Sequence, residues 1–138
     1  MRKSFQVLAE DQEYLDSLGL TWEALIYEGT HWILIYDYPL PEGYVPQKTI
    51  TAIEIATGYP RAQLDMIYFY PEVKRVDSKV IGALSHRNLD VKIFQRWSRH
   101  RTASNPWREG VDNLSTHMAL VEFWLEREFK IRPRAISV

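Results

Sequence analysis

Four runs of β-branched and aromatic residues follow one another in the first half of the chain. They cover residues 21–27, 32–36, 49–55 and 65–70, and this composition is typical of β-strands. The segment Glu28-Gly29-Thr30 matches a hairpin turn between the first two runs, and prolines and glycines interrupt the later connections. Because short connections join neighbouring antiparallel strands, the pattern predicts a four-stranded antiparallel meander.

Helical periodicity occurs at both ends of the chain. Residues 11–18 form a short helical segment, and Gly19 stands in the place of its C-terminal cap. In the last third, apolar residues recur at three- and four-residue spacing, at Leu114, Met118, Val121 and Leu125. We expect Asp112 to cap this second helix, which is predicted to run to about Phe129 and to pack across one face of the sheet.

Between the last predicted strand and the second helix lie roughly forty residues with little regular periodicity. A loop of that length in a compact domain is usually functional or disordered, and its tryptophans argue against disorder. The expected architecture is a single α+β domain over residues 1–138. It combines the four-stranded meander, a short N-terminal helix, a long loop and a C-terminal helix packed on the sheet.

Composition narrows the possible chemistry. The 138 residues are 46% apolar and 25% charged, which is typical of one globular domain. The chain has no apolar run of membrane-spanning length, and its first residues lack the apolar stretch of a signal peptide, so a cytoplasmic location is expected. It has no cysteine, which excludes disulfides, thiolate metal sites and a cysteine nucleophile.

The net charge of −1 hides an uneven distribution. Residues 1–72 carry 4 Lys/Arg and 11 Asp/Glu, whereas residues 73–138 carry 13 and 7. One interpretation is a dipolar surface whose halves attract each other, and another is a basic segment that binds an acidic partner. A nucleic-acid partner is disfavoured because such a footprint normally makes the whole domain basic.

The most unusual segment of the chain is Phe94-Gln95-Arg96-Trp97-Ser98-Arg99-His100-Arg101, with Trp107 shortly after it. This mixture is costly to bury and too aromatic for ordinary surface. The four histidines show no ligand-like pair, so we expect no metal site and no cofactor. If the chain has a reactive centre, this segment is the first place to look for it.

Several landmarks together resemble the ubiquitin-conjugating enzymes. These are the meander, Tyr59-Pro60, the strand end Tyr68-Phe69-Tyr70-Pro71, and Trp107 shortly before the last helix. The segment 95–100 is similar to a signature of the bacterial branch called prokaryotic family E. The resemblance covers roughly residues 8–129. It implies a ubiquitin-conjugating-enzyme-like fold with the long loop as active-site segment, and a transferase that takes a ubiquitin-like protein from an activating enzyme to a target protein.

The same resemblance assigns roles to individual residues. The family has its cysteine about eight residues before the tryptophan, and here Ser98 is the candidate nucleophile at that place, which implies an oxyester instead of a thioester. In an extended segment His100 projects to the same face and can act as base. Asn88, in His86-Arg87-Asn88, falls near the place of the family's His-Pro-Asn triplet. Further candidates, which would bind the partner or stabilise negative charge, are Arg96, Arg99, Arg101 and Trp97.

Other interpretations stay open. Loss of the cysteine also fits an inert relative that binds and presents a ubiquitin-like protein, and arginines interleaved with Trp97 fit an RNA-binding module. Trp97 and Trp107 can equally be packing anchors of the long loop. Asp65 can simply cap a strand or pair with an arginine, and His117 and His31 have ordinary structural explanations.

Overall fold

The computed structural model describes residues 1–134 of the chain. Two helices, α1 (Ala9–Ser17) and α2 (Leu114–Ile131), accompany a six-stranded antiparallel sheet in the order β1-β2-β4-β5-β8-β7. Its strands are β1 (Trp22–Tyr27), β2 (Thr30–Pro39), β4 (Lys48–Ile55), β5 (Ile67–Tyr70), β7 (Leu84–Leu89) and β8 (Lys92–Trp97). A small second sheet pairs β3 (Tyr44–Val45) with β6 (Lys74–Arg75). The α+β class and the meander β1-β2-β4-β5 are therefore confirmed.

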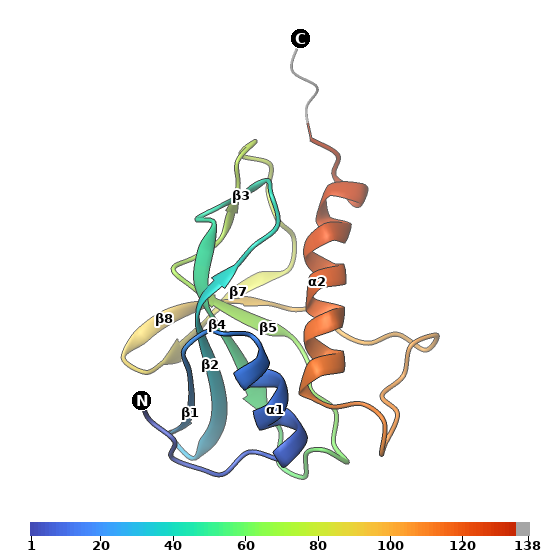
Figure 1. Cartoon of the computed structure of the whole chain (residues 1–138). Helices are drawn as coiled ribbons and strands as arrows, with labels where there is room; N and C mark the ends of the chain where they lie inside the picture. Colours follow the sequence, from blue (N-terminus) through green and yellow to red (C-terminus); the bar gives the residue numbers. More distant parts are fainter. Residues whose placement is uncertain (135–138) are drawn as a thin grey trace.

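The second helix packs across one face of the sheet (Figure 1), and its apolar stripe joins the main core. Met118, Val121 and Leu125 are almost completely buried there, as the periodicity predicted. The N-terminal cap differs from the prediction. Asn113 accepts the backbone N–H of Thr116, whereas Asp112 accepts the backbone N–H of Arg108 and so closes the turn before the helix.

The prediction of one long loop before α2 is wrong for much of that segment. Strands β7 and β8 form a hairpin, which extends the predicted four strands to six. Its turn consists of Asp90 and Val91, with φ of 53° and 55°. Such a turn normally carries Asn or Gly, and β7 is polar along most of its length, so neither signal of a hairpin was present in the sequence.

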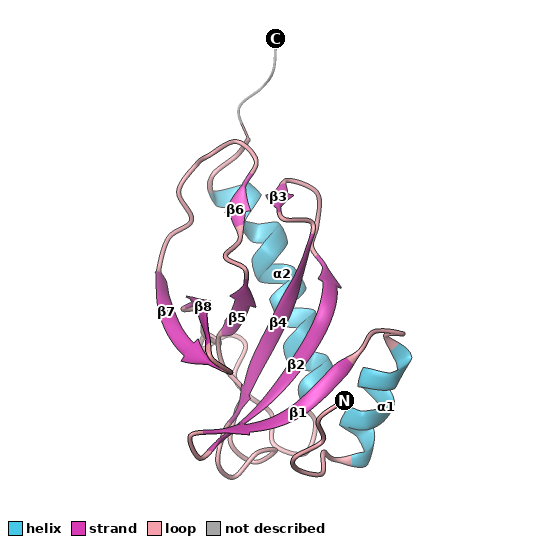
Figure 2. Cartoon of the chain, turned by 90° about the vertical axis from the view of Figure 1, so that its left-hand side faces the viewer, coloured by secondary structure: helices cyan, strands magenta, loops and turns pink. Residues whose placement is uncertain are grey.

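The hairpin folds back over the outer face of the sheet, the face away from α2, and creates a second core there. Phe94 and Leu89 are fully buried in it against Trp32 and Leu34 of β2. The sheet therefore has apolar packing on both faces, but within residues 1–134 a helix covers only one of them (Figure 2). This arrangement places the end of β8 beside the start of β5.

Neither helix in the described part of the chain is long and apolar enough to cross a membrane.

Candidate active site

The segment singled out by the sequence is the end of strand β8 and the residues that follow it. Along β8 the side chains alternate: Trp97 faces α2 and the main core, whereas Phe94 and Arg96 face the outer side of the sheet. If the alternation continues one residue past the strand, the Ser98 side chain lies on the outer side. Its backbone N–H donates to the carbonyl of Ala83 at 3.0 Å, which extends the β7–β8 pairing by one residue.

His100 is oriented by an aspartate from a neighbouring strand connection. Its Nδ1 lies 2.7 Å from Oδ2 of Asp65, just before β5. A carboxylate can only accept, so Nδ1 carries a proton, and in the neutral form of the ring the lone pair is then on Nε2. The imidazole side chain is 57% exposed and that of Asp65 is 30% exposed, which leaves Nε2 accessible to a reacting group.

Ser98 lies close to this pair in the chain but is not bonded to it. The Ser98 side chain is half-buried, and no hydrogen bond joins its Oγ to another residue within 1–134. Residues two apart on an extended segment are about 6.6 Å apart along the strand and point to the same face. Contact between Ser98 Oγ and His100 Nε2 is therefore not formed in this structure, although catalytic hydrogen bonds often tighten only with substrate present.

Asn88 does not belong to this site. It pairs with Ile93 on the far half of the hairpin, five residues along β8 from Ser98, which corresponds to roughly 16 Å. Directly opposite residues of an antiparallel pair point to the same face, so Asn88 also projects toward the α2 side, away from Ser98. The role predicted for Asn88 beside the nucleophile is excluded by this placement.

Trp97 is a core residue. It has no exposed surface, its ring packs edge-on against Phe69, and its Nε1 donates to Gln95 Oε1 at 2.9 Å. A side chain with no exposed surface offers no direct contact to a partner, so the prediction of partner binding by Trp97 is wrong. The alternative prediction of a packing anchor describes it correctly, and it explains how β8 holds Ser98 in a fixed place.

The three predicted arginines lie in different surroundings. Arg99 packs 5.0 Å from the Trp97 ring and donates through Nη1 to the carbonyls of Gly82 and Ser98, both at 3.1 Å. Burial lowers the pKa of the Arg99 guanidinium, partly offset by the carboxylate of Glu128. Arg99 therefore fixes the backbone of Ser98 itself.

Arg101 is also held internally. Its side chain is only 6% exposed, stacks 5.0 Å from the Trp107 ring and lies 3.7 Å from Asp112 Oδ2. Trp107 in turn donates from Nε1 to the carbonyl of Pro60, so both residues anchor the chain before α2. A partner-binding role for Arg101 would need this packing to open.

Arg96 lines a cavity of about 250 Å³ on the outer face, together with Asp65 and Arg87. Its Nε donates to Ser85 Oγ at 2.7 Å, and it is half-buried. Arg96 is thus the one predicted arginine whose side chain borders open space beside the Asp65–His100 pair.

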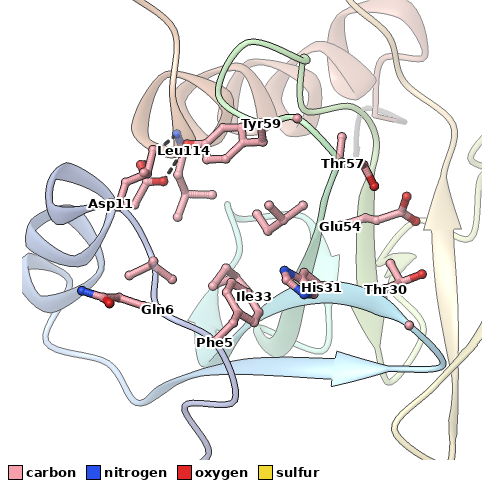
Figure 3. Close-up of a pocket in the computed structure, with 16 residues that line it drawn as sticks. Phe5, Gln6, Asp11, Thr30, His31, Ile33, Glu54, Thr57, Tyr59 and Leu114 are labelled. Carbon is pink, nitrogen blue, oxygen red and sulfur yellow. Dashed lines mark hydrogen bonds between the residues drawn. The ribbon is translucent and has the colours of Figure 1, made fainter.

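A larger cavity of about 500 Å³ lies at the same end of the sheet, between the N-terminal segment, α1 and the residues after β4 (Figure 3). Phe5 stacks on His31 at one side of it, with ring centroids 4.3 Å apart. At another side Asp11 accepts hydrogen bonds from the Tyr59 hydroxyl and the Leu114 N–H. Burial raises the pKa of the Asp11 carboxyl, which these two hydrogen bonds partly oppose. Neither Phe5 nor Asp11 was predicted from the sequence.

No cluster of three or more His, Asp or Glu side chains suited to a metal ion occurs among residues 1–134.

The fold combines an antiparallel meander with a helix across one face and a connecting segment before that helix, and this arrangement is consistent with the ubiquitin-conjugating-enzyme (E2) type. The sequence model of prokaryotic E2 family E matches residues 7–128, nearly the whole chain, and the protein belongs to this family. The family supports a role related to the conjugation of ubiquitin-like proteins, with a ubiquitin-like protein and an activating enzyme as general partners. The searches of curated proteins and of solved structures find no match to the chain.

Proposed function

We propose that the protein is a transferase that accepts an activated ubiquitin-like protein on Ser98 as an oxyester and passes it to a target amine. The observation that supports this most directly concerns His100, which lies two residues beyond Ser98 in the chain and contacts Asp65. A serine hydroxyl, unlike a thiol, needs a neighbouring base to become a nucleophile. The imidazole meets that need because its other nitrogen is held by a carboxylate.

The first step is attack of Ser98 Oγ on the thioester carbonyl of the ubiquitin-like protein carried by the activating enzyme. A C–O bond forms and the C–S bond breaks, while His100 Nε2 takes the serine proton and returns it to the departing thiolate. In the second step a target amine attacks the ester, a C–N bond forms and the C–O bond breaks. Ser98 then regains its proton. An oxyester reacts more slowly with amines than a thioester, so the base is needed in both steps.

The test is intact-mass analysis after incubation with ATP, a ubiquitin-like protein and the activating enzyme that loads it. We expect an adduct that resists reducing agent and is cleaved by mild alkali. Ser98→Ala should abolish it, Ser98→Cys should replace it with an adduct that reducing agent removes, and Ser104→Ala, an exposed serine of the same segment, should not change it. An ester that persists in Ser98→Ala would exclude Ser98 as the acceptor.

Asp65→Asn tests the base more specifically. Because the amide carries no charge and its NH2 can donate to Nδ1, which favours the wrong tautomer, we expect the single-turnover rate of adduct formation to fall about 100-fold. The affinity for the ubiquitin-like protein should stay the same, since Asp65 is assigned to the chemical step. Glu109→Gln, which changes an exposed ion pair with Arg61, is the matched control. A normal rate in Asp65→Asn would remove His100 and Asp65 from the mechanism.

A catalytically inert relative that only binds a ubiquitin-like protein is the second candidate. The observation that favours it is that Ser98 Oγ is not hydrogen-bonded to His100 within residues 1–134. It predicts measurable binding without any covalent adduct, so the same mass measurement separates the two. An RNA-binding function has less support, because Trp97 is fully buried and Arg101 is packed inside the domain.

A further inference from the structure

The two edges of the six-stranded sheet differ in how they are covered (Figure 2). At the β1 edge the N-terminal segment pairs with the strand. Ser4 N–H donates to the carbonyl of Ala24, and Ala24 N–H donates to the carbonyl of Arg2. At the β7 edge no other segment of residues 1–134 pairs with the strand. Proteins usually shield such an edge with proline, a bulge or charged side chains. Strand β7 has no proline and no bulge, and its one charged side chain, Arg87, pairs with Glu54 of the same sheet.

The pairing register identifies the backbone groups that β7 presents outward. The hydrogen bond from Ser98 N–H to the carbonyl of Ala83 makes these two a hydrogen-bonded pair. Because hydrogen-bonded and non-hydrogen-bonded pairs alternate, the N–H and C=O groups of Leu84, His86 and Asn88 point away from β8. All three residues are exposed, so the open edge offers three donors and three acceptors to an extended peptide.

Strand direction decides which end of a bound peptide reaches Ser98. Strand β7 starts next to Ser98, at Leu84, and runs away from it to Leu89. A peptide added antiparallel to β7, like every other pair in this sheet, runs the opposite way and brings its C-terminus to the Ser98 end. The segment that carries an activated carboxyl group in the proposed reaction is the C-terminus of the ubiquitin-like protein.

The distance also fits such a tail. The added strand would lie two strand spacings, about 10 Å, from β8, and about three extended residues span that gap. The tail would pass Ala83, a small exposed residue directly before β7, to reach the outer face on which the strand alternation places Ser98. We propose that strand β7 binds the C-terminal tail of the ubiquitin-like protein by antiparallel strand addition and delivers its terminal carboxyl group to Ser98. This inference rests on the proposed function.

Amide hydrogen exchange gives the clearest test, because it needs no substitution. The probe is a synthetic peptide of the last eight residues of the ubiquitin-like protein used in the mass analysis, with a free C-terminal carboxylate. We expect it to slow exchange at the outward amides of Leu84, His86 and Asn88, with little change at Ser85 and Arg87, which already donate to β8. Protection of none of the three outward amides, or protection on another element, would overturn the inference. Protection that grows with protein concentration without peptide would overturn it too, since this indicates self-pairing.

A pair of variants at one position isolates the backbone contact. His86→Pro removes an outward N–H and leaves the β7–β8 bonds in place, as proline is tolerated on edge strands. We expect it to weaken peptide binding about tenfold, whereas His86→Ala should stay within about twofold. Equal affinity of the two variants would contradict strand addition. If the two His86 variants bind equally and the oxyester still forms on Ser98, the proposed function stands without this docking mode. An ester that persists in Ser98→Ala would instead overturn the proposed function.

Discussion

His117 shows how a single residue inside this fold responds to pH. It lies on α2 with no exposed surface, and its Nε2–H donates to the carbonyl of Met66 at 2.9 Å. Burial lowers the pKa of the imidazole to about 4, assisted by the positive charge of Arg101 and opposed by the Met66 hydrogen bond and Asp65. The folded protein therefore holds His117 neutral, whereas the unfolded chain protonates it near pH 6.5.

This difference predicts a loss of stability under mildly acidic conditions. Between pH 6.5 and 4 the unfolded state binds a proton that the folded state does not, so the free energy of unfolding decreases as the pH falls. From pH 7 to pH 5 the loss should be about 2 kcal/mol. In His117→Gln, whose amide can still donate to Met66, most of this loss should disappear. Urea unfolding at both pH values measures it, and an equal loss in the two proteins would show that other groups are responsible.

Sequence reasoning at the scale of single residues needs only position along one strand for some relations. Ser98 and His100 follow β8 directly, and their common face stays a prediction from the two-residue period of an extended segment. Asp65 could not be assigned to His100, because the contact depends on the pairing of β5 with β8, 35 residues apart in the chain. Asn88 was misplaced for the same reason, since the hairpin that carries it away was not predicted.

At the scale of elements, the β7–β8 turn contains an avoidable strain. Val91 has a φ of 55°, the left-handed conformation that a β-branched residue adopts only at a cost in free energy. Because Val91 is 92% exposed, packing of its side chain does not offset this cost. Val91→Gly should therefore raise the free energy of unfolding by about 1 kcal/mol. The midpoint of urea unfolding at constant slope measures the gain.

The control for this turn is Val80→Gly. Val80 is also highly exposed but does not have a positive φ, so glycine there only adds freedom to the unfolded chain and should slightly destabilise the protein. An equal effect of the two substitutions would mean that the left-handed conformation of Val91 costs nothing.

The helices and the strands differ in how well sequence patterns predict them. The apolar period of α2 repeats over many turns, and its buried face was identified correctly apart from the cap at Asn113. Strand β7 reads as Leu-Ser-His-Arg-Asn-Leu, and only its last residue, Leu89, is buried. A strand stabilised mainly by its neighbour and by a second core on the outer face has no local pattern of its own to detect.

At the scale of the whole molecule, Arg2 links parts of the chain that are far apart in sequence. Its guanidinium lies 2.8 Å from Glu23 Oε2 on β1 and 2.7 Å from Asp90 Oδ2 in the β7–β8 turn. The Glu23 side chain is only 5% exposed and also accepts from the Tyr36 hydroxyl. Arg2 thereby holds the N-terminal segment, the first strand and the hairpin in one arrangement, and it lowers the pKa of the Glu23 carboxyl to about 2.

Replacing Arg2 with methionine keeps most of the aliphatic length of the side chain and removes the charge. The nearly buried Glu23 carboxylate then loses its main partner, so Arg2→Met should lower the free energy of unfolding at pH 7 by about 2 kcal/mol. Amide exchange in the β7–β8 turn should accelerate as well, because Asp90 is released. The comparison is Arg61→Met, which breaks an exposed ion pair with Glu109 and should cost less than about 0.5 kcal/mol.

The pH dependence of the Arg2 variant distinguishes the lost ion pair from lost packing. A carboxyl group whose pKa is lowered by folding stabilises the protein above its unfolded pKa, and this stabilisation disappears as the pH falls through the folded value. The difference between wild type and Arg2→Met should therefore shrink between about pH 4 and pH 2, as Glu23 becomes protonated in both proteins. A difference that stays constant over this range would assign the effect of Arg2 to its packing on β1 and not to its charge.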